Sequence, residues 1–249
     1  MPRIAVDAMG GDQAPHEIVA GAALAAARGI DVVLVGDAGR LQPLVDALDT
    51  ALPVHHASEV IEMADDPAVA IREKKDSSIA VAARLVRDGA ADGMVSAGST
   101  GGVMAAAAFL IGRLPGISRP AIASVFPTGH IVIDAGANLE CKPHHLLQFA
   151  VMGSAVAAVY HSRVNPRVGL LNIGEEDGKG RDLEKDAFAL LAAAPAVNFV
   201  GNVEGRDLAN ETADVFVTDG FTGNVLLKTS EGVGRALYRM IMTSLSANE

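Results

Sequence analysis

Five short segments of this chain combine glycines with small polar side chains, a composition that suits anion binding. Each follows an apolar run typical of a buried strand, and in α/β proteins ligands lie beyond the carboxyl ends of such strands. Backbone amides at glycines can approach an anion closely, and three of the segments lead into a predicted helix N-terminus, which favours negative charge. The segments are 7–12, 96–102, 134–138, 172–180 and 218–224.

These segments supply the candidate residues for binding a phosphate or the rest of a substrate. Any one segment could equally be a tight turn or a helix cap. Together at one predicted sheet edge they favour a phosphate-type site, in which neutral hydroxyl and amide donors complement the backbone. The candidates are Asp7, Gly10, Gly11, Asp12, Ser96, Gly98, Ser99, Thr100, Gly101, Asn138, Asn172, Gly174, Asp219, Thr222 and Gly223.

Segment 172–180, with the sequence NIGEEDGKG, is close to a nucleotide-binding P-loop without matching it. A P-loop has four residues between its glycines and a Ser or Thr after its lysine. Here three residues separate Gly174 from Gly178, and Lys179 is followed by Gly180. The segment is therefore not an ATP site of this kind, and its lysine needs another role.

Other catalytic motifs are missing from the sequence. No G-x-G-x-x-G follows the first predicted strand, which argues against a nicotinamide site, and no G-x-S-x-G marks a serine nucleophile. The adjacent histidines at 55–56 and 144–145 lack the spacing of helical metal ligands, so we expect them on the surface. Cys141 beside Lys142 could be a thiol of lowered pKa, although a bystander cysteine is favoured. Covalent catalysis therefore has little support.

The composition is that of a globular protein with an aliphatic core. Apolar residues make up 50% of the 249 residues, aromatic residues 4%, and there is no Trp. The formal net charge of −10 argues against a nucleic acid or an anionic membrane as a partner through bulk charge. The single cysteine allows no internal disulfide. No apolar run reaches the roughly 18–20 residues of a membrane span and no signal peptide is recognisable, so we expect a cytoplasmic protein.

Apolar runs and longer Ala- or Leu-rich stretches alternate along the chain, which predicts a doubly wound α/β fold. The continuous apolarity of the runs predicts a mostly parallel sheet with helices on both faces. No linker or repeat interrupts the pattern, so we expect one compact domain over 1–249. Predicted strands are 3–7, 32–35, 93–96, 121–125, 130–134, 167–172, 198–200 and 215–219; predicted helices are 15–28, 39–48, 77–87, 100–114, 143–161, 183–193 and 222–245.

Several of the polar segments, with their flanks, resemble bacterial phosphate acyltransferases. The similar stretches are VDAMGGDQAP at 6–15, KKDSS at 74–78, VSAGSTGG at 95–102, GLLNIGEEDGKG at 169–180, NFVGNVEGRDL at 198–208 and DVFVTDGFTGNVLLKT at 214–229. The resemblance covers essentially the whole chain. In the family, Asn usually stands in place of Ser99 and Ala in place of Gly102. The family also usually continues past the end of this chain, with a His-Gly-Ser-Ser-Asp-like motif, so we expect its C-terminal segment to lie outside residues 1–249.

The resemblance implies an enzyme that forms acyl phosphate from acyl–acyl carrier protein and orthophosphate. A membrane glycerol-phosphate acyltransferase would use the product in phospholipid synthesis. The resemblance also implies a homodimer, no metal or organic cofactor, and a fold related to phosphotransacetylase and isopropylmalate dehydrogenase. Two other functions stay open: phosphotransacetylase-like transfer from acyl-coenzyme A, and a non-catalytic dimeric scaffold for lipid-synthesis enzymes.

Lys179 and Asn224 are the predicted catalytic residues. We interpret segment 174–180 as a mobile loop that brings Lys179 to the reacting centre, where its ammonium would counter phosphate or oxyanion charge. An ordinary acidic surface turn is the alternative. Asn224 follows Gly223 near a predicted helix start, where its amide could donate to an oxyanion.

Two basic regions are candidates for contacts with partners. An acidic carrier protein needs a local basic patch on this acidic chain, and the densest cluster consists of Arg72, Lys74, Lys75, Arg84 and Arg87, with a solvated charge run as the alternative. The predicted helix 222–245 is amphipathic, so it could lie on an anionic membrane or pack in a core or a dimer. Its apolar face carries Val233, Leu237, Met240, Ile241 and Leu245, opposite Lys228, Arg235 and Arg239.

Overall fold

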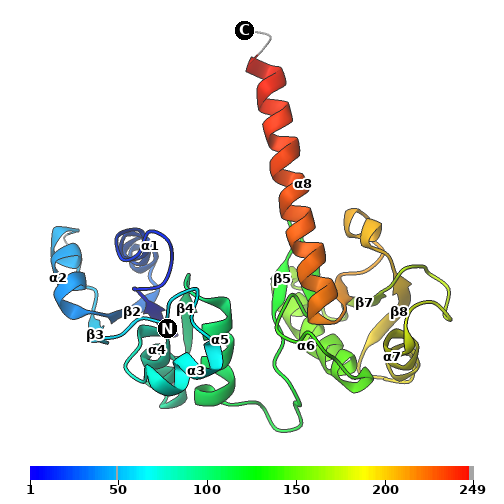
Figure 1. Cartoon of the computed structure of the whole chain (residues 1–249), viewed down its shortest axis with the longest axis horizontal. Coiled ribbons are helices and arrows are strands. Elements are labelled where there is room, and N and C mark those ends of the chain that lie inside the picture. Colours follow the sequence, from blue (N-terminus) through cyan, green and yellow to red (C-terminus); the bar gives the residue numbers. More distant parts are fainter. Residues whose placement is uncertain (49, 247–249) are drawn as a thin grey trace. The chain divides into compact units, whose positions relative to one another are not determined.

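The computed structural model describes residues 1–48 and 50–246 and divides the chain into two compact units (Figure 1). Unit 1 comprises Met1–Pro115 and unit 2 comprises Gly116–Glu249. The sequence predicted one compact domain with one sheet, whereas each unit has a sheet of its own, of four and five strands respectively. Between the two sets of strands lie Gly112, Pro115, Gly116 and Pro120, residue types that end helices and interrupt strands.

Unit 1 has a fully parallel sheet in the order β3-β2-β1-β4. Its strands are β1 (Arg3–Asp7), β2 (Asp31–Gly36), β3 (Val54–His56) and β4 (Gly93–Ser96). Its helices are α1 (His16–Ala27), α2 (Ala38–Ala47), α3 (Pro67–Glu73), α4 (Ser78–Arg87) and α5 (Thr100–Ala106), and a π-helical turn, Ala107–Ile111, continues α5.

Unit 2 has a mixed sheet in the order β5-β6-β9-β7-β8, in which only the β5–β6 pair is antiparallel. Its strands are β5 (Ala123–Val125), β6 (Ile131–Ile133), β7 (Arg167–Leu171), β8 (Asn198–Val203) and β9 (Val215–Val217). Its helices are α6 (Pro143–His161), α7 (Asp182–Ala192), a 3₁₀ turn (Gly205–Ala209) and α8 (Gly220–Ser246).

The sheet of unit 2 carries apolar clusters on both faces, as the continuous apolar runs predicted. Phe149 of α6 and Leu191 of α7 belong to one cluster. Phe216 of β9 and Leu208 of the 3₁₀ turn belong to another, with Leu226 of α8 packed against it. Burial on both faces explains why these strands read as unbroken apolar runs rather than as alternating ones.

Most predicted elements are present within a few residues of their predicted bounds. The sequence analysis missed β3, which is short and carries two exposed histidines, and α3, which begins at Pro67 behind the capping carboxylate of Asp66. The helix predicted at 100–114 is α-helical only to Ala106 and ends at Ile111. The α/β class with mostly parallel strands and helices is confirmed.

His145 contradicts the expectation that both histidines of 144–145 lie on the surface. It is buried in the first turn of α6, where its Nδ1 accepts a hydrogen bond of 3.1 Å from the backbone N–H of Lys142. Burial lowers the pKa of His145 below its ordinary value, and the neighbouring His144 and Arg119 lower it further. His145 therefore completes a helix start instead of facing solvent.

Helix α8 is buried only in its first turn, at Gly220 and Gly223. The five apolar residues of its predicted face, Val233, Leu237, Met240, Ile241 and Leu245, are all more than half exposed. Among the described residues, no helix is long and apolar enough to cross a membrane.

Strand β9 lies between two buried aspartates that are each paired with arginine. Asp214, before the strand, accepts hydrogen bonds from the backbone N–H of Arg167 at 2.7 Å and from its Nη2 at 3.1 Å, and it pairs with Arg163. Burial acts to raise the pKa of Asp214, but the hydrogen bonds from Arg167 and Arg163 outweigh it and lower the pKa to about 2. Asp219, after the strand, belongs to the candidate site.

The depressed pKa of Asp214 predicts a pH-dependent contribution to stability. The contribution is fully present above the ordinary aspartate pKa near 4 and is lost as the pH falls through about 2. At pH 7, Asp214→Asn should lower the free energy of unfolding by about 2 kcal/mol, measured by urea denaturation. The difference from the parent should shrink as the pH is lowered below 4. A difference that stays constant between pH 7 and pH 3 would contradict the account.

Candidate functional site

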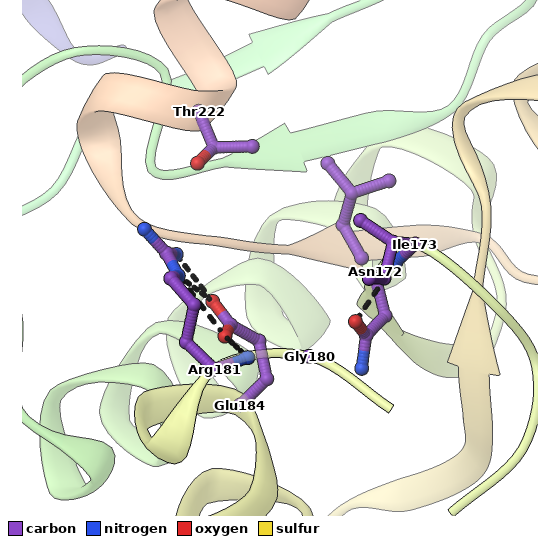
Figure 2. A pocket seen from close by; sticks show the side chains of 7 residues that line it. Asn172, Ile173, Gly180, Arg181, Glu184 and Thr222 are labelled. Carbon is purple, nitrogen blue, oxygen red and sulfur yellow. Dashed lines mark hydrogen bonds and ion pairs between the residues drawn. The ribbon is translucent and has the colours of Figure 1, made fainter. Parts of the chain in front are cut away.

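A pocket of about 340 Å³ opens in unit 2 where β7, α7 and α8 approach one another (Figure 2). The end of β7 and the segment after it form one wall, the first turn of α7 another, and the first turn of α8 a third. This is the sheet edge where the sequence analysis placed ligand binding. The lining residues are Leu171, Asn172, Ile173, Gly180, Arg181, Glu184 and Thr222.

Asp134, directly after β6, fixes the loop that follows β6 at this sheet edge. Its carboxylate is wholly buried and accepts five hydrogen bonds, which curl segment 134–138 around it. The donors are the backbone N–H groups of Ile122, Gly136, Ala137 and Asn138 and the side-chain amide of Asn138. Because Asn138 also donates to the carbonyl of Pro120, both of its amide N–H groups are used within the fold.

The start of α8 fits closely against Asp134. A Cβ at Gly220 would lie 2.6 Å from the carbonyl oxygen of Asn138, and a Cβ at Gly223 would overlap the carbonyl oxygen of Asp134. Only glycine allows this approach. It brings Asn224, which is exposed, beside Gly136, where an added Cβ would lie 3.4 Å from the Asn224 amide carbon.

Asp219, at the end of β9, caps α8. Its Oδ1 accepts from the backbone N–H of Thr222 at 2.8 Å, and its Oδ2 accepts from the Thr222 hydroxyl at 2.9 Å and from Arg181. Burial acts to raise the pKa of Asp219, but the hydrogen bonds from Thr222 and Arg181 outweigh it and hold the pKa below its ordinary value. The side chains of Asp219 and Thr222 are thus engaged with each other.

Segment 172–180 is held in place by its own Asn172 and by side chains from β8 and the 3₁₀ turn. The Asn172 amide donates to the carbonyl of Lys179 at 3.1 Å, and the Asn202 amide donates to the carbonyl of Glu176 at 2.8 Å. Arg206 pairs with Glu175 at 3.3 Å. The segment interpreted as a mobile loop is therefore tied at three points in this structure.

Lys179 keeps its ammonium available. Its Nζ lies 3.8 Å from a carboxylate oxygen of Glu176, a long ion pair in which both side chains are about half exposed or more. Its stem passes over Gly174, where an added Cβ would lie 3.1 Å from the Lys179 Cγ. Glycine at 174 thus leaves room for this lysine.

Unit 1 groups the other candidate residues around a second buried carboxylate. Asp7 accepts from the backbone N–H groups of Met9 and Gly10, both at 3.1 Å, and from the Ser96 hydroxyl at 2.6 Å. The backbone of Gly10 lies against that of Gly98, because a Cβ added at Gly10 would lie 2.9 Å from the Gly98 backbone. The loops after β1 and β4 therefore pack together.

The remaining unit 1 candidates differ in whether their side chains are free to contact a ligand. Ser99 is buried, and its hydroxyl accepts from the backbone N–H of Gly102 at 3.2 Å to cap α5. Gly101 packs against Pro67, and Gly11 has a positive φ of 114°. Asp12 and Thr100 are exposed. The structure thus assembles the predicted residues into two groups, one in each unit.

The predicted docking residues in unit 1 are mostly engaged with neighbours. Lys74 pairs with Asp65 at 2.5 Å, and Arg87 pairs with Asp88 at 2.7 Å. The other engaged residues are Arg84, which donates to the carbonyl of Lys75, and Arg72, whose guanidinium lies 5.4 Å from the ring centre of Phe109. The run is therefore not a uniform basic patch; Lys75 is its exposed lysine.

Among the residues that hold the site together, the sequence analysis did not single out Arg181, Glu184 and Asn202. Glu184 accepts from the backbone N–H of Arg181 at 2.8 Å and from its guanidinium, in the spacing of a capping box. That spacing could have been found in the sequence. Asn202 could not, because its partner carbonyl at Glu176 is 26 residues away.

Cys141 does not have the lowered pKa that its neighbour Lys142 could have given it. Burial, together with the carboxylates of Asp134 and Asp219, raises its pKa to about 11. At neutral pH the side chain is a thiol, which is a weak nucleophile and metal ligand. In residues 1–48 and 50–246, no three His, Cys, Asp or Glu side chains are grouped so that they could hold a metal ion.

Comparison with known proteins decides the family. A family model described as "Fatty acid synthesis protein" matches residues 2–248. A phosphate acyltransferase of Pelotomaculum thermopropionicum is 52% identical over 250 residues, which cover 98% of this chain and 73% of the relative. One of Bacillus pumilus is 48% identical, covering 99% of this chain and 75% of the relative. The chain belongs to the phosphate acyltransferase family.

Membership of the phosphate acyltransferase family makes the chain an acyltransferase and favours an enzyme over a non-catalytic scaffold. Solved structures show the relationship of its fold. The EutD phosphotransacetylase from Staphylococcus aureus matches with a TM-score of 0.66 at 20% identity, covering 94% of this chain and 82% of that one. A branched-chain phosphotransacylase from Enterococcus faecalis V583 matches with a TM-score of 0.59 at 17% identity, covering 92% and 83%. The predicted relationship to the phosphotransacetylase fold is confirmed.

Gly180 provides a direct test of how segment 172–180 is held. Its φ is +91°, and an added Cβ would lie 2.7 Å from the Asn172 Oδ1 and 2.8 Å from the Glu184 Cβ. Gly180→Ala should therefore lower the free energy of unfolding by at least about 1–2 kcal/mol, measured by urea denaturation. Gly178→Ala is the matched control, because no atom lies within 4 Å of its added Cβ. Equal stabilities of the two variants would show that the segment is not built as described.

Proposed function

We propose that this family member forms acyl phosphate from acyl–acyl carrier protein and orthophosphate, and so supplies phospholipid synthesis. Family membership over nearly the whole chain carries the proposal. The strand-end site of unit 2 supports it, because Lys179 directly precedes the pocket residue Gly180 and Asn224 follows the pocket residue Thr222 by two positions.

The reaction requires one bond to form and one to break. An oxygen of orthophosphate attacks the carbonyl carbon of the thioester, and the carbonyl oxygen becomes an oxyanion. The oxyanion then collapses, the C–S bond breaks, and the carrier thiolate leaves and takes up a proton. The enzyme must hold a dianion next to the carbonyl and stabilise the oxyanion, and positioning with preorganised donors can supply most of the acceleration.

Lys179 and Asn224 divide these tasks in the proposal. The ammonium of Lys179 exchanges its long contact with Glu176 for phosphate or the oxyanion. The exposed amide of Asn224, the fifth residue of α8, donates to the oxyanion near the helix N-terminus, where the helix dipole also favours negative charge. Gly174 leaves room for the stem of Lys179, and Gly223 lets the start of α8 pack against Asp134.

Direct attack by phosphate agrees with the state of the only cysteine. With a pKa of about 11, Cys141 is a thiol at neutral pH, and it is only partly exposed. An acyl-enzyme on this residue would need the thiolate. Phosphate itself is therefore the proposed nucleophile.

Acyl-coenzyme A is the alternative donor. The observation that favours it is the fold shared with the EutD phosphotransacetylase, but the identity of 20% supports the fold alone. The two donors present the same thioester and differ in the group that carries it.

We also propose that two surfaces contact partners, one near Lys75 and one on α8. The acidic carrier protein would approach unit 1 near Lys75, the exposed lysine of the basic run. The exposed apolar face of α8 would be covered in a homodimer, or would lie on the cytoplasmic face of the membrane near the glycerol-phosphate acyltransferase that consumes the product.

An acyl-transfer assay tests the donor. The full chain is incubated with orthophosphate and either acyl–acyl carrier protein or acyl-coenzyme A, and acyl phosphate is trapped with hydroxylamine. We expect acyl phosphate from the carrier protein and much less from coenzyme A. Product from coenzyme A alone would make the alternative correct, and product from neither donor would reject the proposed reaction.

The same assay tests the catalytic assignment. Lys179→Ala and Asn224→Ala should each lower kcat by about 10²–10³-fold, as the loss of an oxyanion donor does, with thermal stability near that of the parent because both side chains are largely exposed. Lys185→Ala, on the outer face of α7, is the control and should keep the parental rate. Parental turnover by both site variants at saturating phosphate would reject the assignment.

A further inference from the structure

The two buried aspartates that flank β9 have the same chemistry but different surroundings. Asp214 and Asp219 are 7% and 3% exposed, and each is paired with arginine. The partners of Asp214 come from the start of β7 and the turn before it, at the amino ends of the strands. The partner of Asp219 is Arg181, which follows segment 172–180 and lines the pocket.

Arg181 is fixed from two sides. Its Nε donates to both carboxylate oxygens of Glu184 at 3.1 Å, and its backbone N–H donates to Glu184 at 2.8 Å. Its Nη2 donates to Glu184 and to Asp219. Figure 2 shows the guanidinium directed at the Glu184 carboxylate. Because Glu184 belongs to α7 and Asp219 caps α8, one side chain joins two helix starts.

In the sequence, the two ends of this link are close to the two proposed catalytic residues. Arg181 is two positions after Lys179, and Asp219 is five positions before Asn224. The hydrogen bonds from Thr222 to Asp219 carry the link into the first turn of α8. A displacement of either end therefore changes the distance between the lysine and the asparagine.

We propose that Arg181 is a positioning residue, which sets Lys179 against Asn224 through its ion pairs with Glu184 and Asp219. The inference rests on the proposed function, in which Lys179 and Asn224 act on the same reacting centre. Without the guanidinium, two buried carboxylates would face each other without a cation, a strongly unfavourable arrangement that the segment and α8 relieve by moving apart. An error of about 1 Å in such a site can cost about 10²-fold in rate.

A simple surface ion pair would not have this effect. The side chain of Arg181 is 61% exposed, but the carboxylates it pairs with are nearly sealed from water. The hydrogen bonds between them are therefore charge-assisted and weakly screened. Arg163 offers a matched comparison. It is 52% exposed, pairs with the buried Asp214 in the same unit, and does not line the pocket.

Kinetic coupling with Lys179 tests the proposal. Arg181→Ala should lower kcat by about 10²-fold, with little change in KM for phosphate, and Arg181→Lys should lose less. If Arg181 acts through Lys179, the Arg181→Ala/Lys179→Ala double variant should be no slower than Lys179→Ala alone. Arg163→Ala should stay near the parental rate. A double variant slower than Lys179→Ala by the full Arg181→Ala factor would overturn the proposal.

Amide hydrogen exchange tests the link without relying on turnover. In Arg181→Ala, peptides covering 173–180 and 220–226 should both exchange faster than in the parent, whereas Arg163→Ala should leave both unchanged. Arg181→Lys keeps the charge and serves if Arg181→Ala does not fold. If the Arg181 variant that folds exchanges at the parental rate in peptide 173–180 or in peptide 220–226, the proposal is overturned. If the parent forms no acyl phosphate, the proposed function fails, and the exchange result still decides whether Arg181 joins the two segments.

Discussion

A carboxylate sealed from water must find hydrogen-bond donors inside the protein, and this requirement shapes the strand ends of both units. Asp134 in unit 2 collects four backbone N–H groups and one side-chain amide, which leaves segment 134–138 little freedom. Asp7 in unit 1 does the same on a smaller scale with the loops after β1 and β4. The glycines at 220 and 223 follow from this constraint, because α8 must begin against the filled space around Asp134.

The rest of the unit 2 site depends on the packing of α8 against Asp134. With α8 fixed by Asp134 and capped by Asp219, the segment after β7 can be tied to it through Arg181 and to β8 through Asn202. The result is a cluster of donors whose positions are set before a substrate arrives. Such preorganisation is what the proposed direct attack of phosphate on the thioester needs.

The sequence predicted the parts of this arrangement that depend on local pattern. Apolar runs that end at Asp7 and Ser96 located β1 and β4 with their observed bounds, although Val95 of β4 is 56% exposed, and the glycine segments were found at the ends of strands. Family resemblance added Lys179 and Asn224. What escaped prediction depends on contacts between distant residues. The hydrogen bond between Arg181 and Asp219 spans 38 positions, and the one between Asn202 and Glu176 spans 26. The separation into two sheets depends on which strands pair, and strand periodicity does not encode that choice.

The most direct test of the central claim, that phosphate binds at the strand ends of unit 2, is a titration followed by backbone amide NMR. Orthophosphate is added to the isotopically labelled full chain, with chloride at matched ionic strength as the control. The account predicts saturable shifts for amides in 172–181 and 219–224, and their loss in Lys179→Ala. Shifts confined to 7–12 and 96–101 of unit 1, or none beyond those seen with chloride, would contradict it.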